Sequence, residues 1–79
     1  MKKELSTKTI YDDFLNKTIL TDLEKDVLIR YVKNYSIIKI SDEINQSTST
    51  VSRTISLLKD KYNNYKKIEI EKLKIFENM

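Results

Sequence analysis

The chain has 79 residues, a formal net charge of +3, and neither cysteine nor histidine. A chain of this length makes one domain at most, over residues 1–79, and buries only about 60–65% of the surface that its unfolded form exposes. Its lack of cysteine and histidine excludes disulfides, the usual zinc and haem ligands, and catalysis by a triad, a thiolate or an imidazole. We therefore expect a protein that is not an enzyme and that uses no cofactor and no metal.

The composition also bears on where the protein acts. No apolar stretch approaches the ~20 residues of a membrane span, and the polar start of the chain does not resemble a signal peptide. We expect a soluble, cytoplasmic protein with no membrane partner. Glycine and proline are absent while Lys, Ile and Asn are abundant, as an AT-rich genome of a bacterium, phage or plasmid would produce. Asn, Ser and Asp must therefore supply the turns and helix caps.

The first predicted helix covers 7–17. Lys2 and Lys3 before it are either a disordered start or a weak phosphate-binding arm, and we favour disorder. Its start is marked by a Ser-Thr pair that can cap a helix. Helical spacing then places three apolar residues on one stripe, namely Ile10, Phe14 and Leu15. This stripe is expected to pack in the core.

The second predicted helix has the best-marked start in the chain. Thr21-Asp22-Leu23-Glu24 fits a capping box, in which Thr21 caps the helix and Glu24 reaches back to it. Asn34 is placed to end the helix in the left-handed conformation that glycine usually adopts. The expected buried stripe consists of Leu23, Val27, Leu28, Tyr31 and Val32.

The third and fourth predicted helices form a pair. A short helix of about eight residues follows a Ser36 cap, and the polar stretch Asn45-Gln46-Ser47 separates it from a longer helix over 48–62. Two helices with these lengths and this turn are the dimensions of a helix-turn-helix, here predicted over 36–62. Four residues are expected to close the wedge between the two helices: Ile40, Ile44, Val51 and Ile55.

The outer face of the fourth helix carries small or basic residues and no acidic residue before Asp60. An ordinary solvent-facing helix mixes acidic and basic residues, as the helix over 22–33 does. An acid-free face rich in hydroxyls with one central Arg suits a helix that lies against phosphates and base edges. Its members are Ser49, Ser52, Arg53, Ser56 and Lys59.

The last segment, 65–77, has two possible structures. Helical spacing groups most of its apolar residues on one face, whereas alternation over 68–70 and 73–75 would suit the wing of a winged helix. We favour a helix, because the residues between 68–70 and 73–75 include no Gly, Asn or Asp that could form the turn of a hairpin.

From Leu20 to Tyr62 the chain resembles the LuxR/GerE-type helix-turn-helix domain and, more loosely, the fourth region of bacterial sigma factors. The resemblance lies in three short motifs along this range. They are Leu20-Thr21-Asp22-Leu23-Glu24-Lys25-Asp26-Val27-Leu28, the pair Ile40-Ser41, and Ser47-Thr48-Ser49-Thr50-Val51.

This resemblance implies which residues contact DNA and which join two copies. Base reading would fall to Ser52, Arg53 and Ser56. Phosphate contacts would come from Lys39, Thr48, Ser49 and Thr50, and Lys59 continues the same face. The fourth helix of that family often supplies a dimer interface, which would here fall on Ile68, Ile70, Leu73, Ile75 and Phe76.

The sequence as a whole predicts an all-α fold, a small bundle of four to five helices that contains a tri-helical helix-turn-helix and a C-terminal helix suited to dimerisation. The predicted function is a sequence-specific regulator of transcription that binds double-stranded DNA as a homodimer. The alternative is a protein-interaction module, in which the same core binds RNA polymerase, a sigma factor or another regulator.

Overall fold

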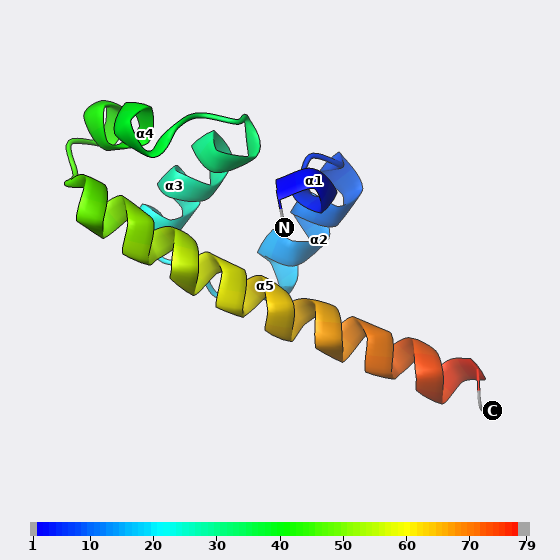
Figure 1. The fold of residues 1–79 in the computed structure, drawn as a ribbon. Coiled ribbons are helices and arrows are strands. Elements are labelled where there is room, and N and C mark those ends of the chain that lie inside the picture. Colours follow the sequence, from blue (N-terminus) through cyan, green and yellow to red (C-terminus); the bar gives the residue numbers. More distant parts are fainter. Residues whose placement is uncertain (1, 78–79) are drawn as a thin grey trace.

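One long helix runs the length of the molecule and the shorter helices pack along it (Figure 1). The computed structural model describes the backbone of residues 2–77 and the side chains of 4–68, and this part is all-helical with no strand. The elements are α1 (Lys2–Leu5), α2 (Lys8–Lys17), α3 (Asp22–Val32), α4 (Ile37–Ile44) and α5 (Thr48–Glu77). The expected all-α class is thus confirmed.

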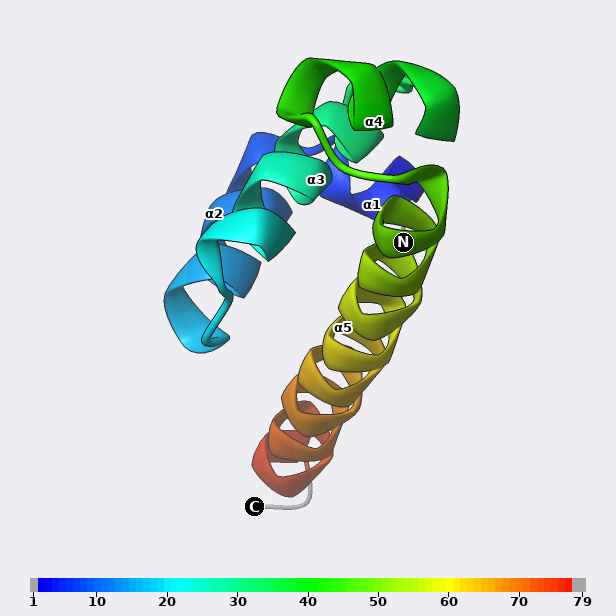
Figure 2. The ribbon, with the colours of Figure 1, turned by 90° about the vertical axis from the view of Figure 1, so that its left-hand side faces the viewer.

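Helix α5 contacts α2, α3 and α4, whereas α1 packs on α2 and α3. The views in Figures 1 and 2 place α3 and α4 beside the first half of α5 and α2 beside its middle. The last turns of α5 extend past the other helices, so the molecule measures 50 × 19 × 16 Å.

Polar caps fix the two ends of α3 as the sequence predicts. The Glu24 amide donates to the Thr21 hydroxyl at 3.1 Å, and the Thr21 amide donates to Glu24 Oε1 at 2.9 Å, which completes the capping box. At the other end Asn34 has φ 71°. The Tyr35 amide there donates to the Arg30 carbonyl at 3.1 Å, so the chain reverses without a glycine.

The N-terminal helices differ slightly from the prediction. The helix expected over 7–17 is confirmed as α2, with Thr7 at its N-cap position. Disorder of the residues before it was a wrong prediction, because Lys2–Leu5 form the short helix α1. Leu5 explains the difference, since its side chain is only 2% exposed and belongs to the core.

The two helices predicted over 48–62 and 65–77 are one continuous helix, so their separation and the alternative of a wing are both wrong. Asn63 and Asn64 lie in the middle of α5 with exposed side chains, so they belong to its polar side and do not disturb its packing. Tyr62 and Tyr65, on either side of them, face the same way, and each packs edge-on against Phe14, with ring centroids 5.5 and 5.4 Å away. No glycine or proline is available to stop the helix there.

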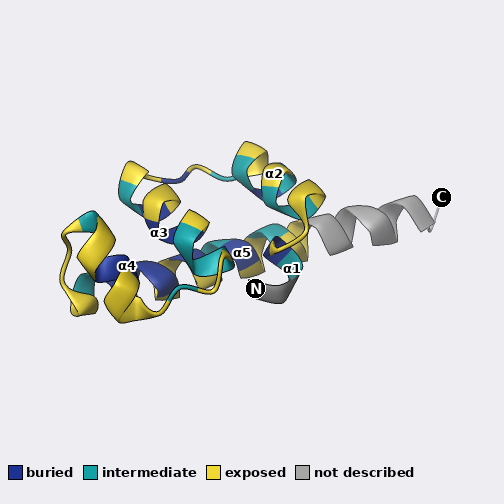
Figure 3. Cartoon of the chain, turned by 90° about the horizontal axis from the view of Figure 1, so that it is seen from above, coloured by how far each residue is buried: buried dark blue, intermediate teal, exposed yellow. Residues whose placement is uncertain are grey.

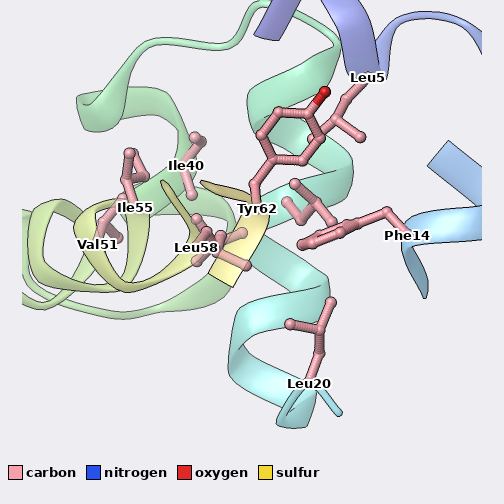
Figure 4. Close-up of a cluster of buried hydrophobic side chains, with 10 residues drawn as sticks. Leu5, Phe14, Leu20, Ile40, Val51, Ile55, Leu58 and Tyr62 are labelled. Carbon is pink, nitrogen blue, oxygen red and sulfur yellow. The ribbon is translucent and has the colours of Figure 1, made fainter. Parts of the chain in front are cut away.

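The core lies on one side of α5 and collects a side chain or more from every helix (Figures 3 and 4). Figure 4 shows Tyr62 reaching from α5 toward Leu5 and Phe14, so the N-terminal helices are joined to the middle of α5. The buried hydrophobic residues are Leu5, Phe14, Leu20, Val27, Leu28, Ile40, Val51, Ile55, Leu58 and Tyr62. The stripes predicted for α2 and α3 are therefore largely confirmed. Phe14, Val27 and Leu28 are buried, and the other members pack half-buried against the core, namely Ile10, Leu15, Leu23, Tyr31 and Val32.

A partly buried ion pair ties α3 to α5. Lys61 Nζ lies 2.8 Å from Glu24 Oε1 and also donates to the Ile19 carbonyl at 3.1 Å. Burial alone would raise the pKa of Glu24, but the Lys61 ammonium and the Thr21 amide outweigh it and hold that pKa below its ordinary value. The same carboxylate thus caps α3 and fixes the position of α5 along it.

Candidate nucleic-acid interface

The connection between α4 and α5 exposes the first turn of α5. Asn45 has φ 55°, in the left-handed region, and the amides of Asn45 and Gln46 both donate to the Ser41 carbonyl. Ser47 then caps α5, because its Oγ accepts from the Thr50 amide at 3.1 Å and donates to Thr50 Oγ1 at 2.9 Å. The amides at the start of a helix carry partial positive charge, which favours an anion there.

Apolar contacts hold α4 and α5 at a fixed angle. Ile40 and Val51 are fully buried between them and Ile55 is nearly so, while Ile44 is half-buried at the edge. Ser41 is also buried, and its hydroxyl donates to the Ile38 carbonyl at 2.8 Å. The four residues predicted to lie between the two helices are thus buried or half-buried, and the small side chain of Ser41 is buried with them.

Thr54 adds a second buried hydroxyl on α5. It is 5% exposed and donates to the Thr50 carbonyl one turn earlier at 2.8 Å. Its hydrogen-bonding capacity is therefore used inside its own helix. Thr54 belongs to the packing of α5 and offers nothing to a ligand.

The acid-free face predicted on the fourth helix is exposed on the first half of α5. Ser52, Arg53 and Ser56 are exposed, as are Thr48, Ser49 and Lys59, whereas Thr50 is half-buried by its role in the cap. We call Ser49, Ser52, Arg53 and Ser56 the α5 face. It opposes the core side of the helix, where Val51, Ile55 and Leu58 lie.

The chain has two arginines, and they differ in what they bind. Arg30 on α3 lies 3.1 Å from Glu43 Oε1 on α4 and donates to the Asp26 carbonyl at 2.8 Å, so it holds two helices together. Arg53 forms no hydrogen bond and no ion pair within the part of the chain that the structure describes. Its five donors remain available for an external partner.

A shallow hollow brings four of the predicted residues together. Thr48, Ser49, Ser52 and Arg53 line it, and Ile37 from the first turn of α4 completes it. Ile37, which was not among the predicted site residues, is 40% exposed and borders the α5 face. Its position directly after the Ser36 cap was the available signal, since a first-turn residue lies at the edge of a helix pair.

Lys39 is not among the residues that line this hollow. Its ammonium stands over the Tyr35 ring at 4.0 Å from the centroid, an arrangement that orients the side chain while leaving it exposed. Ser56 and Lys59 also lie outside the hollow, farther along α5 toward the middle of the helix.

The residues predicted to form a dimer interface are only partly described. Ile68 is 53% exposed and lies in a separate groove, on the part of α5 that follows the core. The side chains of Ile70, Leu73, Ile75 and Phe76 lie outside the described residues.

Comparison with known protein families, with curated proteins and with solved structures finds no match for this chain. The resemblance to LuxR/GerE-type domains therefore depends on the residues from Leu20 to Tyr62 alone. Across the described helices, none combines the length and the apolar character that crossing a bilayer requires.

Proposed function

We propose that the protein is a sequence-specific DNA-binding regulator of transcription, in which α4 and α5 form a helix-turn-helix and the first half of α5 enters the major groove. The observation that carries this proposal is the α5 face, which is exposed, free of acidic residues and centred on an arginine that has no partner among the described side chains. Acidic side chains on such a face would repel phosphates, whereas hydroxyls and a guanidinium bond to bases and phosphates.

Arg53 is the proposed base reader. A guanidinium can donate two parallel hydrogen bonds to O6 and N7 of guanine, which discriminates against the wrong base by about 1–3 kcal/mol. The small serines beside Arg53 let the helix approach the base edges closely, and the exposed start of α5 suits a phosphate. Lys39 and Lys59 are proposed as phosphate contacts on either side.

The experiment that tests this function is selection of DNA from a random pool, followed by footprinting and titration at ~150 mM salt, near physiological ionic strength. We expect one recovered sequence motif and a footprint on it. Recovery of no motif, with affinity equal on all DNA, would overturn the proposal.

Substitutions at Arg53 separate base reading from general attraction. Arg53→Lys keeps the charge and loses the planar fork, so it should lose preference for the site while non-specific binding persists. Lys39→Ala should weaken all DNA equally and reduce the salt dependence by about one phosphate contact. Lys25 is an exposed residue on α3, and Lys25→Ala serves as the control. It should leave both the preference for the site and the general affinity for DNA unchanged.

A second function, docking to RNA polymerase, a sigma factor or another regulator, is favoured by one observation. Ile38 on α4 is 68% exposed, so burying its side chain against a protein partner would be favourable. Under that function, Ile38→Glu abolishes capture of the polymerase subunit or regulator and Arg53→Lys has no effect on it. DNA selection would then recover no motif.

A further inference from the structure

The shallow hollow at the start of α5 has one apolar side chain in an otherwise polar lining. It is lined by Thr48, Ser49, Ser52 and Arg53 from α5 and by Ile37, the first residue of α4. Among the described residues that line it, Ile37 has the only wholly hydrocarbon side chain, and it is 40% exposed. The proposed DNA-binding function gives a role to the guanidinium and the hydroxyls of this hollow and none to Ile37.

The four lining residues from α5 form one compact patch. Thr48 and Ser52 are one helical turn apart on neighbouring turns, and so are Ser49 and Arg53. The patch therefore extends only about 7.5 Å along the helix. Three of its side chains are short, so a ligand in the hollow is within reach of hydrogen-bonding groups and of the hydrocarbon surface of Ile37 at the same time.

The edges of DNA base pairs combine these two kinds of chemistry. In the major groove every pair presents hydrogen-bond acceptors or donors, and the apolar group there is the 5-methyl group of thymine. An exposed isoleucine gains little from a phosphate, which is charged. Contact with a thymine methyl group, by contrast, removes apolar surface of both partners from water.

Packing within the chain does not account for the exposure of Ile37. The buried residues of α4 are Ile40 and Ser41, and Ile37 is not among the residues that form or pack against the hydrophobic core. The next residue, Ile38, is 68% exposed and is not among the residues that line the hollow. These two isoleucines therefore differ in one respect that matters here, which is that only Ile37 shares the hollow with Arg53.

We infer that Ile37 is a specificity-determining residue, and that it contacts the 5-methyl group of a thymine close to the guanine that Arg53 recognises. This inference rests on the proposed DNA-binding function and specifies its target further. Both residues line one hollow, and successive base pairs are about 3.4 Å apart, so the thymine lies within two base pairs of the guanine on either strand. The hollow thus recognises two positions of the site, one by hydrogen bonds and one by an apolar contact.

Replacement of thymine by uracil tests this contact, because it removes the 5-methyl group and keeps the hydrogen-bonding groups of the base. In the selected DNA site, the guanine is the base whose preference Arg53→Lys abolishes. Each thymine of the site is then replaced in turn, and dissociation constants are measured by fluorescence anisotropy at ~150 mM salt. One replacement within two base pairs of the guanine should weaken binding about fourfold, as expected for one methyl group exposed to water. Replacements farther away should have no effect.

Variants at two positions assign the effect to one side chain. Ile37→Ala should bind the thymine and uracil duplexes equally, whereas Ile38→Ala, the matched control on the same helix, should keep the fourfold difference. Ile37→Val retains a branched apolar side chain and should keep most of it. Each variant is judged by the ratio of two affinities, so a general loss of stability or of affinity for DNA cancels. Far-UV circular dichroism reports whether the fold is intact.

Three results would overturn the role of Ile37. The first is a selected site without a thymine within two base pairs of the guanine, and the second is a wild-type chain that binds every uracil duplex as tightly as the thymine duplex. The third is a fourfold ratio that persists in Ile37→Ala. In the second case, a loss of guanine preference in Ile37→Ala would show that Ile37 only positions the Arg53 side chain.

The two proposals fail in different ways. Selection that recovers no motif refutes the DNA-binding function and, with it, the thymine contact. A selected site that depends on Arg53 but is insensitive to every replacement of thymine by uracil keeps the function and refutes the contact with Ile37.

Discussion

Replacing Lys61 with methionine isolates the ion pair that locates α5 against α3. Methionine keeps most of the aliphatic stem and removes the ammonium that lies 2.8 Å from Glu24 Oε1. The Glu24 side chain is 6% exposed, and its Oε2 has no partner among the described residues. After the substitution, the carboxylate keeps only the hydrogen bond from the Thr21 amide.

The expected loss of stability follows from this geometry. A hydrogen bond to a charged group contributes about 1.5–3 kcal/mol, and the 35% exposure of Lys61 places the loss toward the lower end, at about 2 kcal/mol. For a domain of this size that corresponds to a fall in Tm of about 8–16 °C. The free energy of unfolding of a domain of this size is only about 4–12 kcal/mol, so a loss of this magnitude is readily measured.

Lys66→Met is the matched control for this substitution. Lys66 lies on α5, as Lys61 does, and its Nζ is likewise 2.8 Å from a carboxylate oxygen, Glu4 Oε1. The side chains of Lys66 and Glu4 are, however, 51% and 38% exposed. Solvent screens such a pair, so its loss should be much smaller. Urea denaturation of the two variants and the wild type, followed by circular dichroism, compares them. Equal losses from Lys61→Met and Lys66→Met would refute the view that burial makes the Glu24 pair important.

Three further outcomes are expected. The pKa of Glu24 is lowered in the fold, so the contribution of this carboxylate to the free energy of unfolding is complete above the ordinary value of 4.5 and is lost as the pH falls below it. Glu24→Gln should therefore flatten this part of the plot of stability against pH. An unchanged plot would contradict the role of Glu24 in it. Asn45→Ala should cost about 1 kcal/mol in denaturation experiments, because the short polar side chain of asparagine can hydrogen-bond locally in the left-handed conformation and alanine cannot, whereas Asn45→Gly should be neutral or stabilising. Leu58→Ala should cost about 2–5 kcal/mol, since Leu58 is fully buried, and a loss below that of Asn45→Ala would show that the core rearranges around it.

Local signals in the sequence were enough for most of the fold. The capping box at Thr21, the Ser36 cap and the left-handed Asn34 each depend on neighbours within a few residues, so they could be predicted from spacing, whereas the left-handed Asn45 was not predicted. The continuity of α5 could not be predicted this way. It depends on Tyr62 and Tyr65 packing against Phe14, about 50 residues earlier in the chain.

The candidate site divides along the same line. The exposure of the α5 face follows from the helical period that buries Val51, Ile55 and Leu58, and the sequence predicts it. The position of Ile37 beside Arg53 and the exposure of Ile19 depend on how helices meet in space. The same is true of the pair between Glu24 and Lys61, whose partners are 37 residues apart. Residue spacing within a single segment cannot predict these contacts, because their partners lie on different helices.

The packing of α1 and α2 against the middle of α5 has a consequence for the order in which the protein folds during synthesis. Leu5 leaves the ribosome long before Tyr62, the residue on α5 that it lies beside (Figure 4). At about 5–20 residues per second the delay is about 3–11 s. Throughout that time Phe14 lacks both of its aromatic partners. The packing of the first two helices is therefore complete only after Tyr62 and Tyr65 have been made, and a chain that stops before Tyr62 should not fold.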